Sequence, residues 1–216
     1  MPKAPARKKT PVVEGRSAKR ERLRQELVNA ALRQFEARGF DAVTVDDIVE
    51  KVDVSRRSFF RYFASKDDLV FSWLDDMGDM IRPVLCQQLA AGNVPLALRN
   101  AFLDLAAQLD REPDNPVFLT RLIFGTPALG ARYQEEAMRW ESEFVRIAQA
   151  MLPAPDSDQF QRQVQSSTAI AAWIAALRAW AASNHSSPLA GFVTEAFKTL
   201  LDGAKPSRRG TPTRNA

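Results

Sequence analysis

Residues 44–66 read TVDDIVEKVDVSRRSFFRYFASK, and this stretch contains three residues suited to capping helices. Thr44, Ser55 and Ser65 each stand where a side-chain oxygen can accept a hydrogen bond from the backbone of a following helix. Asp47 can complete a capping box with Thr44, although glutamate is the usual partner. The stretch therefore predicts a short helix, a tight turn, a second short helix and the start of a long helix, which together form a helix-turn-helix.

The second short helix separates aromatic side chains from basic ones. Phe59 and Phe63 are four residues apart and are expected to face the core, whereas Arg57 and Arg61 share a different face. In the DNA major groove, arginine can bind a guanine edge with two hydrogen bonds, and aromatic rings can pack on thymine methyls. The flanking and phosphate-facing candidates are Arg56, Ser58, Phe60, Tyr62 and Lys66. No acidic residue lies between Val54 and Lys66, which suits a surface that faces a phosphate backbone.

Positive charge is concentrated at both ends of the chain. Residues 1–24 contain nine Lys or Arg against two Glu, and residues 203–216 contain four Lys or Arg and no acid. Because the whole chain carries +4, these ends at +7 and +4 leave residues 25–202 at −7. The expected partner of the N-terminal third is therefore a polyanion. The basic arm, residues 1–16, is expected to be disordered, and both minor-groove insertion and a purely solubilising role stay open.

Few residues suited to catalysis or metal binding are present. With one cysteine, Cys86, and one histidine, the chain cannot form an intramolecular disulfide framework or a thiolate zinc site. It also lacks a nucleophile motif and a Gly-rich phosphate loop, so we expect neither an enzyme nor a bound cofactor. No apolar run approaches the ~20 residues of a membrane span, and the N-terminus lacks an apolar signal region. A cytoplasmic protein associated with the nucleoid, without membrane contact, is expected.

Apolar residues recur at three- and four-residue spacings along most of the chain, which is the period of amphipathic helices. No segment alternates with the period of a strand. The expected fold is all-α, with a small N-terminal three-helix DNA-binding unit and a larger C-terminal helical domain for ligand binding and dimerisation. The expected boundaries are a basic arm at 1–16, the DNA-binding domain at 17–66, the helical domain at 67–202 and a disordered basic tail at 203–216.

The helical domain carries enough aromatic and leucine side chains to line an apolar cavity. The candidate ligand-binding residues are Phe102, Phe118, Leu122, Phe124, Tyr133, Trp140, Phe144, Trp173 and Leu177. The alternative, which is the better prediction for any single ring, is that these side chains only fill the core. Their pattern therefore leaves both a ligand site and a solid core open.

The segment AIAAWIAALRAWAA, residues 169–182, is apolar on nearly every face. A helix on the surface of a monomer cannot be apolar all round, so this one must be covered on both sides. One side is expected to face the core or a pocket, and the other a partner subunit. The alternative is a central helix that is fully buried within a monomer.

The stretch TVDDIVEKVDVSRRSFFRYFASKDDL, residues 44–69, resembles the helix-turn-helix of the tetracycline-repressor (TetR) family of bacterial transcription regulators. Members of that family are usually homodimeric repressors whose third helix binds in the major groove. The resemblance implies that Arg56, Arg57 and Arg61 contact bases. It also implies that Thr44, Ser58, Tyr62 and Lys66 contact the DNA backbone.

Two residues depart from the family pattern. Asp53 stands in the turn where glycine is usual, and we expect it to adopt the left-handed conformation at a small cost. Phe60 replaces the usual tyrosine, so a hydroxyl contact to phosphate is expected to be lost there. Neither change removes the predicted helix-turn-helix.

The resemblance also bears on the helical domain. Residues 116–140 loosely resemble actinobacterial regulators that sense fatty-acyl or acyl-CoA-like ligands, and family members usually dimerise through their last two long helices, here residues 160–202. The expected function is a repressor that a small apolar effector, such as a fatty acid or acyl-CoA, releases from a palindromic double-stranded DNA operator. The alternatives are a constitutive or architectural DNA-binding protein and, as a different class, an α-helical enzyme.

Overall fold

The computed structural model describes residues 15–112, 114–152, 157–183 and 187–203. Within these ranges every regular element is an α-helix, and there are nine of them, which confirms the predicted all-α fold. The chain divides into two compact units between Leu69 and Val70. The predicted arm at 1–16 and tail at 203–216 lie almost wholly outside the described residues.

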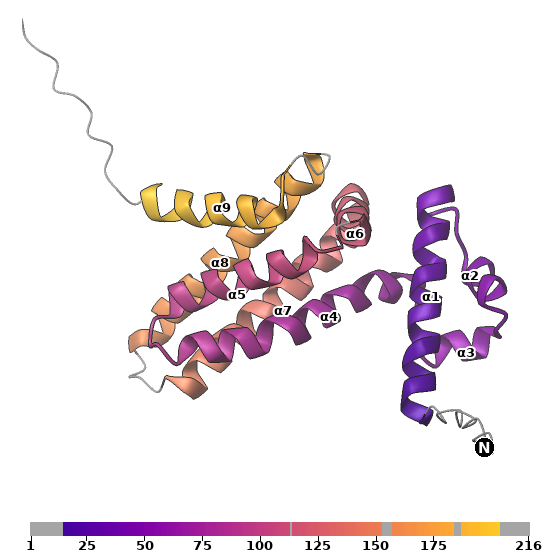
Figure 1. The fold of residues 1–216 in the computed structure, drawn as a ribbon, viewed down its shortest axis with the longest axis horizontal. Helices are drawn as coiled ribbons and strands as arrows, with labels where there is room; N and C mark the ends of the chain where they lie inside the picture. Colours follow the sequence, from indigo (N-terminus) through magenta and orange to yellow (C-terminus); the bar gives the residue numbers. More distant parts are fainter. Residues whose placement is uncertain (1–14, 113, 153–156, 184–186, 204–216) are drawn as a thin grey trace, which may run out of the picture. The chain divides into compact units, whose positions relative to one another are not determined.

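The first unit contains the helix-turn-helix (Figure 1). Its helices are α1 (Arg16–Arg38), α2 (Val45–Val52), α3 (Arg56–Phe60) and the first residues of α4 (Lys66–Leu89). Helix α1 ends at Arg38, and Gly39 caps it with a backbone φ of 81°, which favours glycine. Helix α1 packs on α2 and α2 packs on α3 around a small apolar core that includes Leu27, Phe35 and Ile48.

The predicted caps form. Thr44 and Asp47 make the complete capping box at the start of α2, and the Ser55 side chain accepts from the backbone N–H of Ser58 at the start of α3. Asp68 Oδ2 accepts from the Ser65 N–H, and Ser65 Oγ accepts from the Asp68 N–H, so α4 begins in the same way. These local hydrogen bonds satisfy N–H groups that a helix terminus cannot pair internally.

The turn between α2 and α3 depends on Asp53. Its φ of 53° and ψ of 49° lie in the left-handed region, as predicted, and it is the only non-glycine residue with positive φ in the described part of the chain. Helix α3 is shorter than expected, since the regular helix ends at Phe60. A hydrogen bond from the Phe63 N–H to the Phe59 carbonyl oxygen at 3.1 Å nevertheless continues the turn, so both rings are buried as predicted.

The second unit is a bundle around α8 (Figure 1). Besides the rest of α4, its helices are α5 (Val94–Leu109), α6 (Asp114–Gly125), α7 (Pro127–Met151), α8 (Ser157–Ala182) and α9 (Leu189–Gly203). Helix α8 contacts α5, α6, α7 and α9, which explains why the 169–182 segment is so rich in apolar residues. Trp173 and Trp180 of α8 are among the largest fully buried side chains.

The outer side of α8 is exposed in the single chain. Ala171, Ala175 and Ala179 lie on it, at intervals of four residues, while Trp173 and Leu177 point into the bundle and are buried. One face of this helix thus fills the core, and the opposite face consists largely of small side chains. The prediction that a partner subunit covers the second face is not tested by this arrangement.

Long-range polar contacts tie the bundle together. The Asp110 carboxylate, just after α5, accepts from the backbone N–H groups of Leu189 and Ala190 at 2.7 and 3.1 Å, and so caps the start of α9. Between α4 and α7, Arg82 Nε donates to Glu143 Oε1 at 2.7 Å. Pro83 lies within α4.

Candidate DNA-binding surface and effector cavity

The arginines of α3 and the turn after it differ in their surroundings. Arg56, Arg57 and Arg61 are all exposed. Arg56 Nη1 donates to Asp46 Oδ2 of α2 at 2.9 Å, and its guanidinium lies 5.8 Å from the centre of the Phe60 ring. Across residues 15–112 and the other described ranges, Arg57 has no hydrogen-bond or ion-pair partner. Arg57 therefore offers its guanidinium to a ligand without first breaking a contact, whereas Arg56 does not.

Adjacent phenylalanines have opposite roles at this surface. The Phe59 side chain is fully buried, whereas Phe60 is 47 % exposed. The two rings meet edge to face at 5.3 Å between centroids. Because a large exposed ring costs hydration free energy in the free protein, Phe60 marks a place where a partner surface can remove it from water.

Tyr62 lies between two cations. The Arg61 guanidinium is 5.1 Å from the ring centre and its Nη2 donates to the phenol oxygen at 3.3 Å, while Arg20 of α1 lies 5.8 Å from the same ring. Two guanidinium groups on one ring form a compact positive site suited to a phosphate. Sequence reasoning missed Arg20, because no local spacing relates α1 to the residues after α3.

The hydroxyl groups predicted to face phosphates already make hydrogen bonds at the starts of α2 and α3. Thr44 Oγ1 donates to Asp47 Oδ2 at 2.6 Å, and Ser58 Oγ lies 3.1 Å from Ser55 Oγ. Thr44 is exposed and Ser58 is half-buried. The Thr44 hydroxyl has a single proton, so donating it to a phosphate would compete with its hydrogen bond to Asp47.

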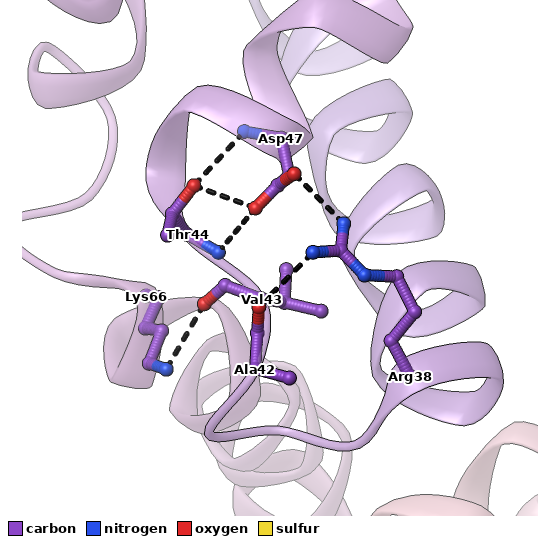
Figure 2. Close-up of polar contacts among 6 residues, drawn as sticks. All are labelled: Arg38, Ala42, Val43, Thr44, Asp47 and Lys66. Atoms are coloured by element: carbon purple, nitrogen blue, oxygen red, sulfur yellow. Dashed lines mark hydrogen bonds and ion pairs between the residues drawn. The ribbon is translucent and has the colours of Figure 1, made fainter.

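Lys66 holds the segment between α1 and α2. Its Nζ donates to the carbonyl oxygens of Phe40 and Val43 at 2.8 and 3.0 Å, and it lies 4.3 Å from the centre of the Phe40 ring. Figure 2 shows the ammonium group turned towards the loop that leads into Thr44. An ammonium has three N–H groups, so two are engaged here and one remains for another acceptor. The predicted phosphate contact stays a prediction, beside a positioning role that the sequence did not indicate.

Arg38 fixes the same loop from the end of α1. Its Nη1 donates to Asp47 Oδ1 at 2.7 Å and its Nη2 donates to the Ala42 carbonyl oxygen at 3.1 Å (Figure 2). The hydrogen bond from Arg38, followed by those from the Thr44 hydroxyl and backbone, holds the pKa of Asp47 well below its usual range. Asp47 is therefore ionised at neutral pH. Its ion pair with Arg38 connects the start of α2 to the end of α1.

The helical domain contains a small cavity between α4, α7 and α8, with a volume of about 10 Å³. Three predicted ligand residues, Tyr133, Trp140 and Trp173, line it. The other lining residues are Leu74, Glu136, Ala137 and Ile170. Sequence reasoning missed these four, although Ala137 and Ile170 each stand three residues before a predicted tryptophan and so share its helix face.

The remaining predicted ligand residues do not line this cavity. Phe102 stacks on Trp173 at 5.0 Å and meets Phe144 edge to face at 5.8 Å, so these rings form part of the packed core. Phe124 packs against Tyr133 at 5.1 Å and carries the Arg178 guanidinium 4.7 Å from its ring centre. Phe118 and Leu122 are half-buried on α6, and Leu177 is buried on α8. The structure thus gathers one third of the predicted set around a cavity.

Two buried donors of α8 lack partners. Trp173 Nε1 and Ser166 Oγ are buried, and neither has a hydrogen-bond partner in the described ranges. Burial raises the pKa of the Tyr133 phenol well above its ordinary value, and the adjacent Trp173 indole offsets this only in part. The indole lies close to the phenol, but Nε1 does not meet hydrogen-bond geometry with it. Tyr133 is therefore neutral at physiological pH.

A capped helix-turn-helix with an exposed basic and aromatic edge defines a helix-turn-helix regulator, and comparison with known proteins gives the family. Residues 27–72 match the family model of bacterial regulatory proteins of the tetR family, and residues 93–205 match the model of the MftR C-terminal domain. The HTH-type transcriptional regulator TcmR of Streptomyces glaucescens is 30 % identical over 167 residues, which cover 73 % of each chain. This chain belongs to the TetR family of transcriptional regulators.

Solved structures share the fold. FadR of Thermus thermophilus, a TetR-family repressor solved with lauroyl-CoA, has 24 % identity and a TM-score of 0.56 over 89 % of this chain and 100 % of its own. FadR of Bacillus subtilis, solved with stearoyl-CoA, has 15 % identity and a TM-score of 0.55 over 84 % of this chain and 99 % of its own. At these identities the likeness concerns the arrangement of helices.

None of the helices in the described ranges is both long enough and apolar enough to cross a bilayer. Nor does any group of three or more His, Cys, Asp or Glu side chains in those ranges have the geometry to hold a metal ion.

Proposed function

We propose that this regulator is a repressor that binds a palindromic operator as a homodimer and is released by a small apolar or acyl-type effector. The observation that carries the DNA-binding part is the edge formed by Arg57, Phe60 and Arg61. All three are exposed, while the neighbouring Phe59 and Phe63 are buried and hold the segment in place. Exposed arginines on an anchored segment suit direct contacts to base edges, because the backbone that carries them is already fixed and need not be ordered on binding.

Base contacts and phosphate contacts divide among the basic residues. Arg57 is the primary candidate for a bidentate contact to guanine, because no partner competes for it in the described ranges. Arg56 must exchange its pair with Asp46 for a base, and this exchange makes its contribution smaller. Arg20, Tyr62 and Lys66 form the candidate phosphate contacts around this edge.

Dimerisation is proposed through residues 160–202. Large apolar side chains are exposed on this part of the single chain: Phe160 at 78 %, Val164 at 46 % and Leu200 at 39 %. A groove of about 480 Å³, lined in part by Val164, Phe197 and Leu200, runs between α5, α8 and α9. Exposed apolar surface of this kind is stabilised by a partner, and a twofold axis would present two copies of α3 to one operator.

The effector is proposed to bind the helical domain and to favour the form that does not bind DNA. Its support is the aromatic lining of the cavity and the two FadR relatives in fold that were solved with acyl-CoA, which make acyl thioesters the first class to test. A coupling of about 1–3 kcal/mol would weaken operator binding roughly five- to 150-fold. The proposed site of action is the nucleoid in the cytoplasm.

A constitutive DNA-binding protein is the second candidate, and one observation favours it. The cavity of about 10 Å³ holds about one water molecule, so this cavity has no room for an effector as it stands. An effector must then open the core. If a panel of acyl-CoAs, fatty acids and hydrophobic drugs leaves operator affinity unchanged, the constitutive function is the correct one.

The operator itself is testable without knowing the effector. Selection of bound duplexes from a random DNA library, followed by footprinting, is expected to yield a palindrome with half-site centres about one helical turn, or a multiple of it, apart. Recovery of a single asymmetric half-site would contradict the dimer. Equal affinity for selected and random duplexes would contradict sequence-specific regulation and favour an architectural role.

A further inference from the structure

Among the residues that line the cavity between α4, α7 and α8, one buried hydrogen-bond donor has no partner in the described ranges. Trp173 is 1 % exposed and lines the cavity, and its Nε1 has no hydrogen-bond partner in the described ranges. An indole N–H can only donate, so it cannot be satisfied by another N–H. Leaving such a donor buried without a partner costs about 1–3 kcal/mol. This cost is one that a bound acceptor would remove.

The charge of the lining restricts what that acceptor can be. The seven lining residues include no Lys or Arg, and the only ionisable groups among them are Glu136 and Tyr133. Glu136 pairs at 2.8 Å with Arg139, which is 70 % exposed and does not line the cavity. Arg178, the cation that acts on Tyr133, lies over the Phe124 ring. A carboxylate placed here would be desolvated next to Glu136 and would find no cation among the lining side chains, which is unfavourable.

We infer that the effector enters this cavity with an uncharged group that carries a hydrogen-bond acceptor, and that this acceptor binds Trp173 Nε1. The inference deepens the proposed effector response and rests on it. A ketone, ester, amide or thioester carbonyl meets the requirement, whereas the carboxylate of a free fatty acid does not. Within the acyl ligands, a thioester is therefore favoured over the free acid.

The aromatic lining supplies the rest of the recognition. Trp140 and Tyr133 border the cavity together with Leu74 and Ile170, so the surface around the acceptor is apolar. Binding must displace some of these side chains, because the present volume is about that of one water. The orphan donor then selects among apolar ligands by hydrogen bonding, which shape alone cannot do.

Three probes of nearly equal size separate the possibilities. Acetophenone carries a neutral acceptor, ethylbenzene carries none, and benzoate carries an anionic one. The full chain has four tryptophans, so its ¹⁵N-labelled form gives an indole N–H signal for each, and the signal lost in Trp173→Phe identifies Trp173. The titrations are recorded on the DNA-free wild type, so they need no operator.

The expected result is a downfield shift of the Trp173 indole proton with acetophenone and no such shift with ethylbenzene or benzoate. Acetophenone should also bind Trp173→Phe roughly five- to tenfold more weakly than wild type, while ethylbenzene binds both equally. Ser166→Ala is the control, because it removes the other unpaired donor of α8, which does not line the cavity. It is expected to leave the acetophenone shift unchanged.

Each other outcome overturns the inference. A Trp173 signal that no probe moves means that the donor is held by an ordered water or within the core. A shift with benzoate as large as that with acetophenone means that charge does not select. These readouts do not involve DNA. If acetophenone shifts the Trp173 signal but selection recovers no operator, the proposed function is contradicted and the inference stands.

Discussion

Among the described residues, buried polar side chains without a hydrogen-bond partner occur in the helical domain and not in the DNA-binding unit. In the first unit Thr44, Ser55 and Ser65 all cap helices, and Lys66 has two carbonyl partners. In the second, Trp173 Nε1 and Ser166 Oγ are buried without partners in the described ranges. Satisfied polar groups make a structure rigid, whereas unsatisfied ones leave free energy for a ligand to recover.

This difference fits two kinds of recognition. A helix-turn-helix must present its arginines in one fixed geometry. Its caps and loop contacts provide that geometry before DNA binds, at the cost of conformational entropy. A domain that responds to a ligand needs a second arrangement of comparable free energy, and a core with unpaired donors is a natural source of one. The fixed geometry expected of the DNA-binding unit can therefore be tested by the loss of single side chains.

The largest expected effect comes from replacing one of two adjacent rings. Phe59→Ala removes a fully buried ring from the small core and is expected to lower the free energy of unfolding by about 3–5 kcal/mol. Phe60→Ala makes the same chemical change at a ring that is 47 % exposed, and its effect on stability should stay within about 0.5 kcal/mol. Urea unfolding followed by circular dichroism measures both.

DNA binding gives a second measurement for the exposed ring. Phe60→Ala is expected to remain folded and yet bind the selected operator more weakly, because its ring is proposed to pack against DNA. Equal stability losses in the two variants would show that the edge formed by Arg57, Phe60 and Arg61 is part of the core. The proposal that this edge contacts DNA would then be wrong.

The next effect concerns the exposed arginines. Arg57→Ala is expected to cost about 1–3 kcal/mol of operator binding and to relax base preference at one position in each half-site. Arg56→Ala is the matched control and should cost less, since the pair between Arg56 and Asp46 has to be given up on binding. Binding measured against a set of single-base operator variants distinguishes the two. Unchanged base preference in Arg57→Ala would show that Arg57 does not contact a base.

Lys66 offers a test of positioning against direct phosphate contact. Lys66→Met leaves the carbonyl oxygens of Phe40 and Val43 without their donor and is expected to lower stability by about 1–2 kcal/mol. If the third N–H also contacts phosphate, the slope of log affinity against log salt falls by about 0.9. We expect both effects. Lys51→Met, at an exposed lysine of α2, should change stability by less than about 0.5 kcal/mol.

A salt slope that Lys66→Met leaves unchanged, together with the stability loss, would exclude the phosphate contact. Lys66 would then act only by holding the loop before α2. No stability loss would contradict the positioning role instead, because the two hydrogen bonds would not be formed in solution.

Features set by neighbouring residues could be predicted from the sequence. The caps at Thr44 and Ser55, the left-handed Asp53 and the burial of Phe59 follow from chemistry within a few residues, and all are present. The helical class of the larger domain followed from the apolar period in the same way.

Contacts between distant segments could not be predicted. Lys66 bonds carbonyl oxygens 23 and 26 residues earlier, and Asp110 caps a helix that begins 79 residues later. Such partners depend on how the helices pack, and no local period encodes that packing. The same reason explains why the aromatic pattern predicted nine ligand residues, although only Tyr133, Trp140 and Trp173 line the cavity.

The smallest expected effect concerns the pH dependence of Asp47. Its carboxylate accepts three hydrogen bonds, from Arg38 and from the Thr44 hydroxyl and backbone, and these hold its pKa below the usual range. A group with a lowered pKa in the folded state contributes its full stability above its unfolded pKa of about 4, and this contribution falls progressively as the pH drops from that value towards the lower pKa of the folded state. The melting temperature of wild type should therefore exceed that of Asp47→Asn at pH 7, and the difference should shrink towards pH 3.

Asp46→Asn is the control, since the Asp46 carboxylate accepts a single hydrogen bond from the exposed Arg56, and its difference from wild type should change less with pH. A constant difference between wild type and Asp47→Asn from pH 7 to pH 3 would show that the capping geometry, and not the charge of Asp47, stabilises the start of α2.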